Sequence, residues 1–82
     1  MKLLIVEDEK RLCETIAKYF KAEGYSIDTC HDGNDALDYI NGTEYDAIVL
    51  DIMLPGIDGI SVLRTIRNRK MTTPVLLLTA KT

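Results

Sequence analysis

Three short runs of consecutive apolar residues recur along the chain, at positions 3–6, 47–50 and 75–78. Runs of this length without polar alternation are typical of strands in a parallel sheet that helices cover on both faces. Residues 25–30 differ, because Ile27 stands between the polar residues Ser26 and Asp28. This partial alternation predicts an edge strand with one solvated face.

Apolar stripes with helical spacing fill the intervals between these strands. They consist of Leu12, Ile16 and Phe20, with Ala17 beside them; of Ala36, Leu37 and Ile40; and of Ile60, Leu63 and Ile66. Gly24 offers a left-handed stop for the first helix, and Asp58 can cap the start of the third.

Strands and helices therefore alternate, which predicts right-handed crossovers and a doubly wound parallel α/β sheet in one domain, residues 1–82. The predicted strands occupy about residues 2–6, 25–30, 46–51 and 74–79, and the predicted helices 9–23, 33–41 and 58–69.

Composition narrows the class of protein. The net charge of -3 argues against nucleic acid as a direct partner, and the basic residues Arg64, Arg67, Arg69 and Lys70 suit a solvated helix end. Two cysteines do not form a disulfide framework. No apolar run approaches the roughly 18 residues that span a bilayer. We therefore expect a soluble, cytoplasmic protein without a membrane partner.

Polar side chains stand where the predicted strands end. Glu7 and Asp8 follow the first strand, Asp51 ends the third, and Thr79 ends the last. In such sheets ligands bind beyond the carboxyl ends of the strands. Carboxylates that crowd together there need a hard divalent cation, and Mg²⁺ is the natural candidate.

A carboxylate beside Mg²⁺ can attack a phosphoryl donor and become an acyl phosphate. In this interpretation Asp51 is the nucleophile, and Glu7, Asp8, Asp51 and the backbone carbonyl of Met53 surround the ion. The hydroxyl of Thr79 and the backbone N–H of Ala80 would face the phosphoryl oxygens.

Other interpretations of these residues remain open. The acidic residues can be helix caps in a purely structural or interaction module, and Pro55-Gly56 by itself indicates only a turn. A hydrolase of the haloacid dehalogenase type also uses a strand-end Asp and Mg²⁺, but it needs a second Asp where Met53 stands. No glycine-rich nucleotide-binding loop occurs.

The chain closely resembles the receiver domain of two-component response regulators. The motifs that carry the resemblance are Glu7-Asp8, Asp51-Ile52-Met53-Leu54-Pro55-Gly56-Ile57-Asp58-Gly59 and Pro74-Val75-Leu76-Leu77-Leu78-Thr79-Ala80. The resemblance implies a flavodoxin-like sheet of order 2-1-3-4 and a phosphoacceptor that is not a turnover enzyme. It implies that Asp51 is phosphorylated by a sensor histidine kinase, that Glu7, Asp8 and the Met53 carbonyl support Mg²⁺, and that Thr79 is the switch hydroxyl.

The sequence style is similar to the winged-helix transcription-factor branch, the OmpR/PhoB type, in which DNA is bound only through a separate output domain. The family pattern continues with a fifth strand, a Lys at its end, an aromatic switch residue and two more helices, all beyond residue 82. We therefore expect a truncated receiver domain that is poorly phosphorylated. We also expect it to self-associate through its last strand or to be only marginally folded.

Overall fold

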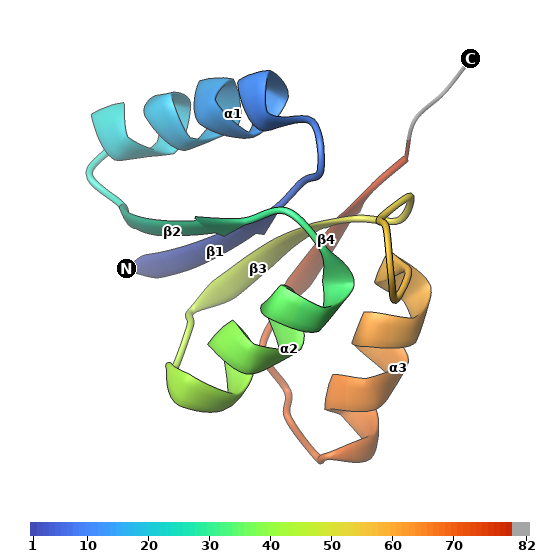
Figure 1. The fold of residues 1–82 in the computed structure, drawn as a ribbon. Helices are drawn as coiled ribbons and strands as arrows, with labels where there is room; N and C mark the ends of the chain where they lie inside the picture. The colour runs from blue at the N-terminus through green and yellow to red at the C-terminus, as the bar shows by residue number, and fades with distance from the viewer. Residues whose placement is uncertain (80–82) are drawn as a thin grey trace.

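The computed structural model describes residues 1–79 and contains four parallel strands and three helices (Figure 1). The strands are β1 (Lys2–Val6), β2 (Ser26–Cys30), β3 (Ala47–Asp51) and β4 (Val75–Leu78), and the helices are α1 (Lys10–Ala22), α2 (Gly33–Gly42) and α3 (Gly59–Asn68). Each boundary lies within one residue of the position that the sequence predicts. The sheet order β2-β1-β3-β4 confirms the predicted topology.

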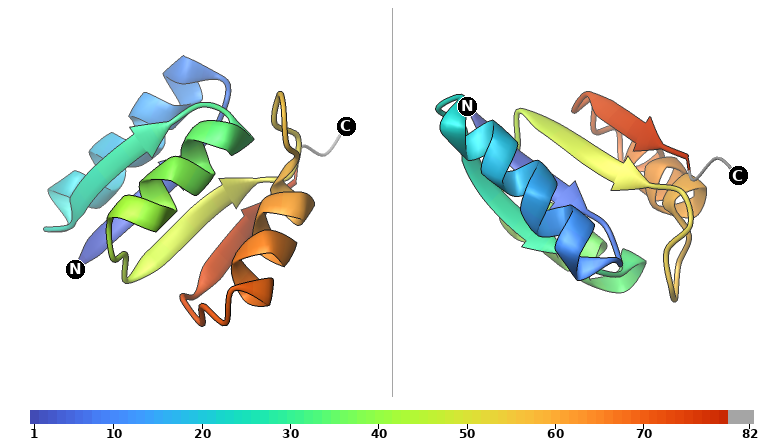
Figure 2. Two further views of the ribbon diagram at one scale, coloured as in Figure 1. Left: turned by 60° about the horizontal axis from the view of Figure 1, so that its bottom comes forward. Right: turned by 90° about the horizontal axis from the view of Figure 1, so that it is seen from above.

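The helices form one layer on each side of the sheet. Helix α1 lies on one face, and α2 and α3 lie on the other (Figures 1 and 2). This division follows from right-handed crossovers, because the chain first moves from β1 outward to β2 and then returns across β1 to reach β3. The switch point of the sheet is therefore between β1 and β3.

The larger part of the core lies beneath α2 and α3. There Leu4 and Leu50 from the sheet pack with Ala36 of α2 and with Val62 and Ile66 of α3. The predicted stripe of α3 is partly wrong, because Ile60 is 38% exposed whereas Val62 is fully buried. The side chain of Asp58 caps the helix by accepting a hydrogen bond from the Ser61 amide, as the sequence predicts.

The smaller part of the core lies beneath α1, where Cys13 and Ala17 pack against Ile5 and Val49. Within the predicted α1 stripe, Ile16 and Phe20 pack against this cluster and the neighbouring Ala17 is buried, but Leu12 is 43% exposed. The small side chains of Cys13 and Ala17 explain the difference, because they let the helix approach the sheet closely along their side.

The prediction that residues 75–78 are buried on both faces is wrong. Strand β4 is an edge of the sheet and Leu76 is 60% exposed, because α1 contacts mainly β1 and β2 and leaves this end of its face open. The prediction of β2 as the other edge strand is confirmed. Gly24 has φ 95°, as expected for the residue after a helix end.

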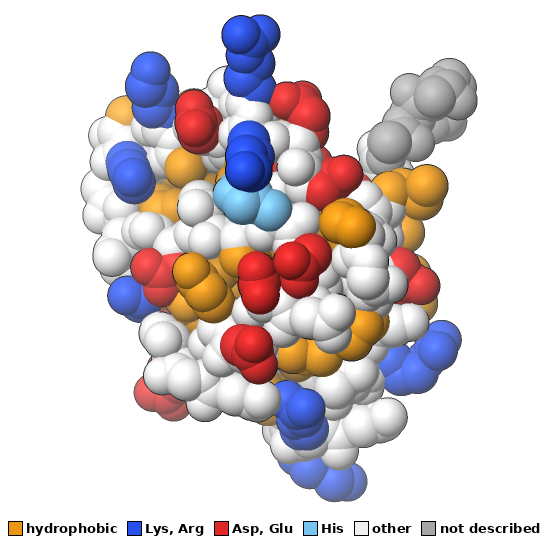
Figure 3. Space-filling model, viewed as in Figure 1, with side chains coloured by type: hydrophobic (Ala, Val, Ile, Leu, Met, Phe, Trp, Pro, Cys, Tyr) orange, Lys and Arg blue, Asp and Glu red, His pale blue; other side chains and the backbone are white. Residues whose placement is uncertain are grey.

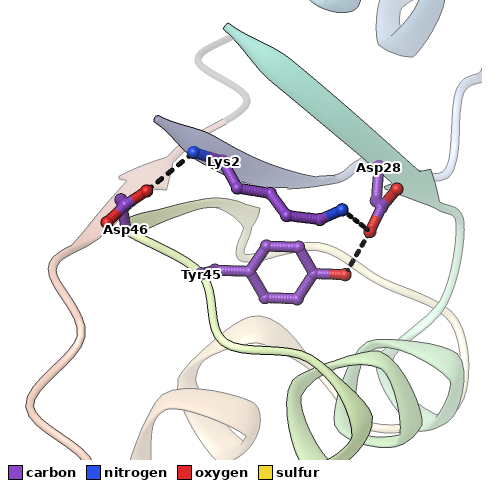
Figure 4. A network of polar contacts seen from close by, with 4 residues as sticks. All are labelled: Lys2, Asp28, Tyr45 and Asp46. Atoms are coloured by element: carbon purple, nitrogen blue, oxygen red, sulfur yellow. Dashed lines mark hydrogen bonds and ion pairs between the residues drawn. The ribbon is translucent and has the colours of Figure 1, made fainter.

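A polar network reaches from Lys2 and Asp46, at the start of β1 and β3, to Asp28 in the middle of β2 (Figure 4). The hydroxyl of Tyr45 donates to Asp28 Oδ2 at 2.6 Å, and Lys2 Nζ lies 3.7 Å from the same oxygen. The backbone N–H of Lys2 donates to Asp46 Oδ2 at 2.7 Å. The carboxyl ends of the strands, at the opposite edge, remain available for a site.

Over residues 1–79, no helix is both long enough and apolar enough to cross a membrane. The side chains of Arg64, Arg67, Arg69 and Lys70 are all exposed. Arg67 Nη1 donates to the Met71 carbonyl, and Arg69 Nη1 donates to Asn41 Oδ1. The basic cluster is therefore a solvated helix end with some of its donors already used by neighbouring groups.

Candidate functional site

Three carboxylates meet at the carboxyl end of the sheet. One oxygen from each of Glu7, Asp8 and Asp51 lies within 4.8 Å of the other two. Glu7 and Asp51 are only 4% and 6% exposed, whereas Asp8 faces solvent. The structure thus brings together the three acidic residues that the sequence singles out, at the switch point of the sheet.

The register between β1 and β3 explains this meeting. Val6 pairs with Leu50, so the next residues along the two strands, Glu7 and Asp51, stand side by side. Because strand side chains alternate between faces, both residues continue the row of Ile5 and Val49 on the face that α1 partly covers. Two carboxylates are therefore placed next to each other by the same pairing that builds the core.

Backbone amides hold the two buried carboxylates in place. The N–H of Glu9 donates to Glu7 Oε2 at 2.9 Å, and the N–H of Met53 donates to Asp51 Oδ1 at 3.2 Å. His31 Nδ1 lies 2.9 Å from the carbonyl oxygen of Glu7. Since a carbonyl can only accept, Nδ1 carries the proton and the ring donates it.

Among the described residues, no basic side chain pairs with the negative charge of this site. Burial raises the pKa of Glu7, and the neighbouring carboxylates of Asp8 and Asp51 raise it further, while the hydrogen bond from the Glu9 amide opposes the rise. The site therefore favours either a proton or a cation.

A hard cation suits these donors. Mg²⁺ prefers oxygen ligands, one or two of them carboxylates, and keeps several waters. Glu7, Asp8 and Asp51 supply carboxylate oxygens at one place, partly exposed through Asp8. The residues present therefore fit Mg²⁺.

A cavity of about 320 Å³ adjoins the carboxylates. Its lining consists of Glu7, Leu12, Ile16, Asp51, Leu78 and Thr79. Thr79 thus shares a cavity with Asp51, although it belongs to a different strand end. Ala80, whose backbone N–H is also a predicted contact, lies outside the described residues.

The loop between β3 and α3 closes the other side of the site. Its groove, about 740 Å³, is lined by Asp8, Ile52, Met53, Leu54, Asp58, Ile60, Ser61 and Arg64. The side chain of Met53 is 67% exposed, whereas Leu54 anchors the loop in the core. The Met53 amide reaches Asp51, and the use of its carbonyl as a metal ligand stays a prediction.

Two residues beside the site are not among those that the sequence singles out for it. His31 contacts Glu7 through the backbone, and its signal is only its place directly after β2 at the same edge of the sheet. Gly59 lies against the backbone of Asp51. Glycine is a poor helix former, so a glycine at the first position of a helix is a sequence signal that a side chain would not fit there.

On the surface shown in Figure 3, basic side chains gather over α1 and around the far end of α3, with acidic side chains between them. Acidic side chains also stand among the basic ones over α1, so this side offers both signs of charge to solvent. The acidic region includes the start of α2, where Asp32 and Asp35 stand close enough for Asp32 to raise the pKa of Asp35.

The chain matches known proteins over almost its whole length. A family model described as the response regulator receiver domain matches residues 3–82. The transcriptional regulatory protein DltR of Streptococcus agalactiae is 48% identical over 81 residues, and TcrA of Mycobacterium tuberculosis is 44% identical over 81 residues. These alignments cover 99% of the chain but only 36% and 32% of the relatives. The chain spans about a third of the length of these curated relatives.

Solved structures agree with the sequence matches. The receiver domain of the Francisella response regulator 1452 has a TM-score of 0.94 and 39% identity, covering 96% of this chain and 65% of that one. The response regulator TrrA of Thermotoga maritima, solved in complex with Mg²⁺ and BeF, has a TM-score of 0.93 and 38% identity. That match covers 99% of this chain and 70% of TrrA. The chain belongs to the response regulator receiver domain family.

Proposed function

We propose that this chain is a phosphoacceptor: Asp51 takes a phosphoryl group from a phosphohistidine of a sensor histidine kinase in the cytoplasm. The observation that supports the proposal is the convergence of Glu7, Asp8 and Asp51 beside a cavity that Thr79 also lines. An oxygen of Asp51 would form a bond to phosphorus while the bond between phosphorus and the imidazole nitrogen breaks. The electron pair of that bond stays on the imidazole, and the product is an acyl phosphate.

The chain's own residues would prepare this step. The Met53 amide holds Oδ1 of Asp51, which fixes the plane of the carboxylate and aims it. Glu7, Asp8, Asp51 and the Met53 carbonyl would hold Mg²⁺, which when bound neutralises charge on the carboxylates and the arriving phosphoryl oxygens. The Thr79 hydroxyl can donate to a phosphoryl oxygen from the cavity wall.

We place the output of this switch in another part of the protein. The curated relatives are named transcriptional regulatory proteins, and the chain matches only about a third of their length. A net charge of -3 gives the chain itself little attraction for DNA. The proposal is therefore that phosphorylation of Asp51 controls a winged-helix output domain, and that DNA is contacted only there.

Acetyl phosphate with Mg²⁺ tests the phosphoacceptor. Intact mass spectrometry is expected to find one added phosphoryl group, however slowly it forms, and none on Asp51→Asn or when EDTA removes the metal. Asp58→Asn is the matched control, because asparagine caps a helix as well as aspartate and Asp58 is not among the three clustered carboxylates. Continuous turnover of a phosphoester would indicate a hydrolase instead, and labelling that survives Asp51→Asn would refute the proposal.

A second function has its own supporting observation, the edge of β4. No charged residue occurs between Met71 and Thr79, and Leu76 is 60% exposed. The carbonyls of Pro74 and Leu78 accept hydrogen bonds from the amides of Ile48 and Ile52. By alternation, the N–H and C=O groups of Val75 and Leu77 therefore point away from the sheet. Such an edge is a template for another strand.

We propose that a second copy of the chain occupies this edge. Antiparallel pairing of Val75 with Leu77 of the second copy uses every outward backbone group of the two strands and places Leu76 opposite Leu76. Sedimentation velocity is expected to show a monomer–dimer equilibrium that depends on concentration. A monomer at all concentrations, with a cooperative thermal transition, would contradict this second function and leave the first untouched.

A further inference from the structure

The turn from β2 into the start of α2, residues 31–34, touches both loops that carry the clustered carboxylates. On one side, His31 Nδ1 donates to the carbonyl oxygen of Glu7 at 2.9 Å. On the other, the N–H of Gly33 donates to the carbonyl of Pro55 at 3.4 Å, in the loop that follows Asp51. Figures 1 and 2 both show the start of α2 beside the β3–α3 loop.

Gly33 leaves no room for a side chain at this contact. A Cβ at position 33 would stand 1.9 Å from the carbonyl oxygen of Ile57 and 2.8 Å from its carbonyl carbon. Backbone atoms cannot rotate away as a flexible side chain can, so the loop itself would have to move. The requirement is for close approach and not for backbone freedom, since Gly33 does not have a positive φ.

Movement of this loop would reach the carboxylates directly. The loop segment that contacts Gly33, residues 55–57, follows Met53 by two residues, and the Met53 amide donates to Asp51 Oδ1. The Leu54 side chain is buried in the core between these two contacts. Gly33 and Asp51 therefore contact the same short loop, one on each side of its Leu54 anchor.

We propose that His31 and Gly33 are positioning residues, which set the separation between the β1–α1 loop with Glu7 and Asp8 and the β3–α3 loop with Met53. His31 fixes one loop by a hydrogen bond, and Gly33 fixes the other by close packing. The inference rests on the proposed function for its metal readout. It adds that the turn from β2 to α2, which supplies no ligand, sets the affinity of the site.

Gly33→Ala tests the packing contact, with Gly42→Ala as its matched control. Both glycines belong to α2, and a Cβ at position 42 would meet nothing within 4 Å. Isothermal titration with Mg²⁺ is expected to give about 10- to 100-fold weaker binding for Gly33→Ala, the usual effect of losing an outer-shell support. Gly42→Ala is expected to bind as the unaltered protein does.

A second control separates the loss of this contact from a general loss of stability. Ile66→Val removes a methylene group from the core far along α3 and lowers stability by about 0.5–1.5 kcal/mol, yet Mg²⁺ affinity is expected to stay unchanged. His31→Leu removes the other contact and is expected to weaken Mg²⁺ binding. His31→Asn restores a side-chain N–H near the former Nδ1 and is expected to recover most of that loss.

The Met53 amide gives a readout that needs no metal. In ¹⁵N-labelled protein, its resonance is expected to shift and its hydrogen exchange to accelerate in Gly33→Ala but not in Gly42→Ala. Unchanged Mg²⁺ affinity and an unchanged Met53 amide in Gly33→Ala would overturn the inference. Failure of the unaltered protein to bind Mg²⁺ would instead refute the proposed metal site, and the amide readout would still decide the role of the turn.

Discussion

The carbonyl oxygen of Asp51 lies so close to Gly59 that a Cβ at position 59 would stand 2.2 Å from it. Gly59 is the first residue of α3, and its N–H donates to the carbonyl of Ile52 at 2.9 Å. The β3–α3 loop therefore returns onto the strand end from which it started. The proposed phosphoacceptor is thus supported from beneath by the start of a helix.

Gly59→Ala is expected to destabilise the protein. A glycine-to-alanine change in a helix ordinarily gains about 0.5–1 kcal/mol, but overpacking against the Asp51 backbone costs about 1–3 kcal/mol, so the net change is a loss. Urea unfolding followed by circular dichroism measures it. Gly42→Ala, with open space around the new methyl group, is expected to gain stability or leave it unchanged. Equal effects of the two substitutions would contradict the close contact.

Asp51→Asn is expected to stabilise the protein when no divalent metal is present. The substitution removes one of three clustered carboxylates, and the relief of repulsion at this distance is worth about 1–3 kcal/mol at the dielectric constants that describe proteins. Thermal unfolding in EDTA is the measurement, and added Mg²⁺ is expected to raise the melting temperature of the unaltered protein only. The exposed Asp38→Asn serves as control, with a change within about 0.5 kcal/mol.

The raised pKa of Glu7 makes the stability of the folded protein depend on pH in a definite direction. The folded state binds the Glu7 proton more tightly than the unfolded chain, whose pKa is near 4.5. Without metal, this residue's contribution is therefore most favourable below pH 4.5 and is lost as the pH rises through the folded value. Urea unfolding of the unaltered protein and of Glu7→Gln across this range measures it as a difference. A difference that does not change with pH would show that Glu7 is not perturbed.

Tyr45→Phe is expected to cost about 1 kcal/mol. The hydroxyl of Tyr45 donates to the carboxylate of Asp28 at 2.6 Å, and hydrogen bonds to charged groups are worth about 1.5–3 kcal/mol. The loss is smaller here because water can reach Asp28 once the hydroxyl is gone. Tyr39→Phe is the control, since Tyr39 is 40% exposed. Equal free energies of unfolding for the two variants in chemical denaturation would show that the Tyr45 hydrogen bond contributes nothing.

Leu76 variants test the pairing of β4 edges. Leu76→Lys is expected to abolish association, because a charge at an edge opposes strand pairing, whereas Tyr19→Lys on the surface of α1 is expected to leave it intact. Leu76→Cys is expected to form an intermolecular disulfide on mild oxidation, since directly opposed residues in antiparallel strands suit its geometry. Cys13 and Cys30 are buried and do not compete. A Leu76→Cys protein that stays monomeric under oxidation would exclude this pairing.

Sequence patterns predict most of the fold and the meeting of the carboxylates. Apolar runs locate the strands, and alternation of strands and helices fixes the sheet, so Glu7 and Asp51 come together through pairing that the core requires. The phase of α1 is harder to predict. Leu12 is more apolar than Cys13, yet it is Cys13 that packs against the sheet, because helix position depends on how closely the backbones can pack.

Contacts made by backbone groups cannot be predicted from sequence patterns. The carbonyl of Glu7 that His31 binds, and the carbonyl of Ile57 that Gly33 approaches, belong to groups that every residue has. No residue type marks them, and only the three-dimensional path of the chain brings them together. The same reason leaves the role of the Met53 carbonyl to experiment.

The Tyr45–Asp28 hydrogen bond and Asp51 are separated both along and across the sheet, because Asp28 is in register with Leu4 on β2 whereas Asp51 follows Leu50 on β3, two strands away. Three residues of strand span about 10 Å, and two strand spacings also span about 10 Å, so the total separation exceeds the roughly 7–10 Å within which substitutions interact energetically. A Tyr45→Phe change combined with Gly59→Ala should therefore cost the sum of the separate losses. Substitutions around Tyr45 and Asp28 can therefore accumulate during evolution without altering the chemistry of the carboxylate site, which leaves this small domain room to diversify.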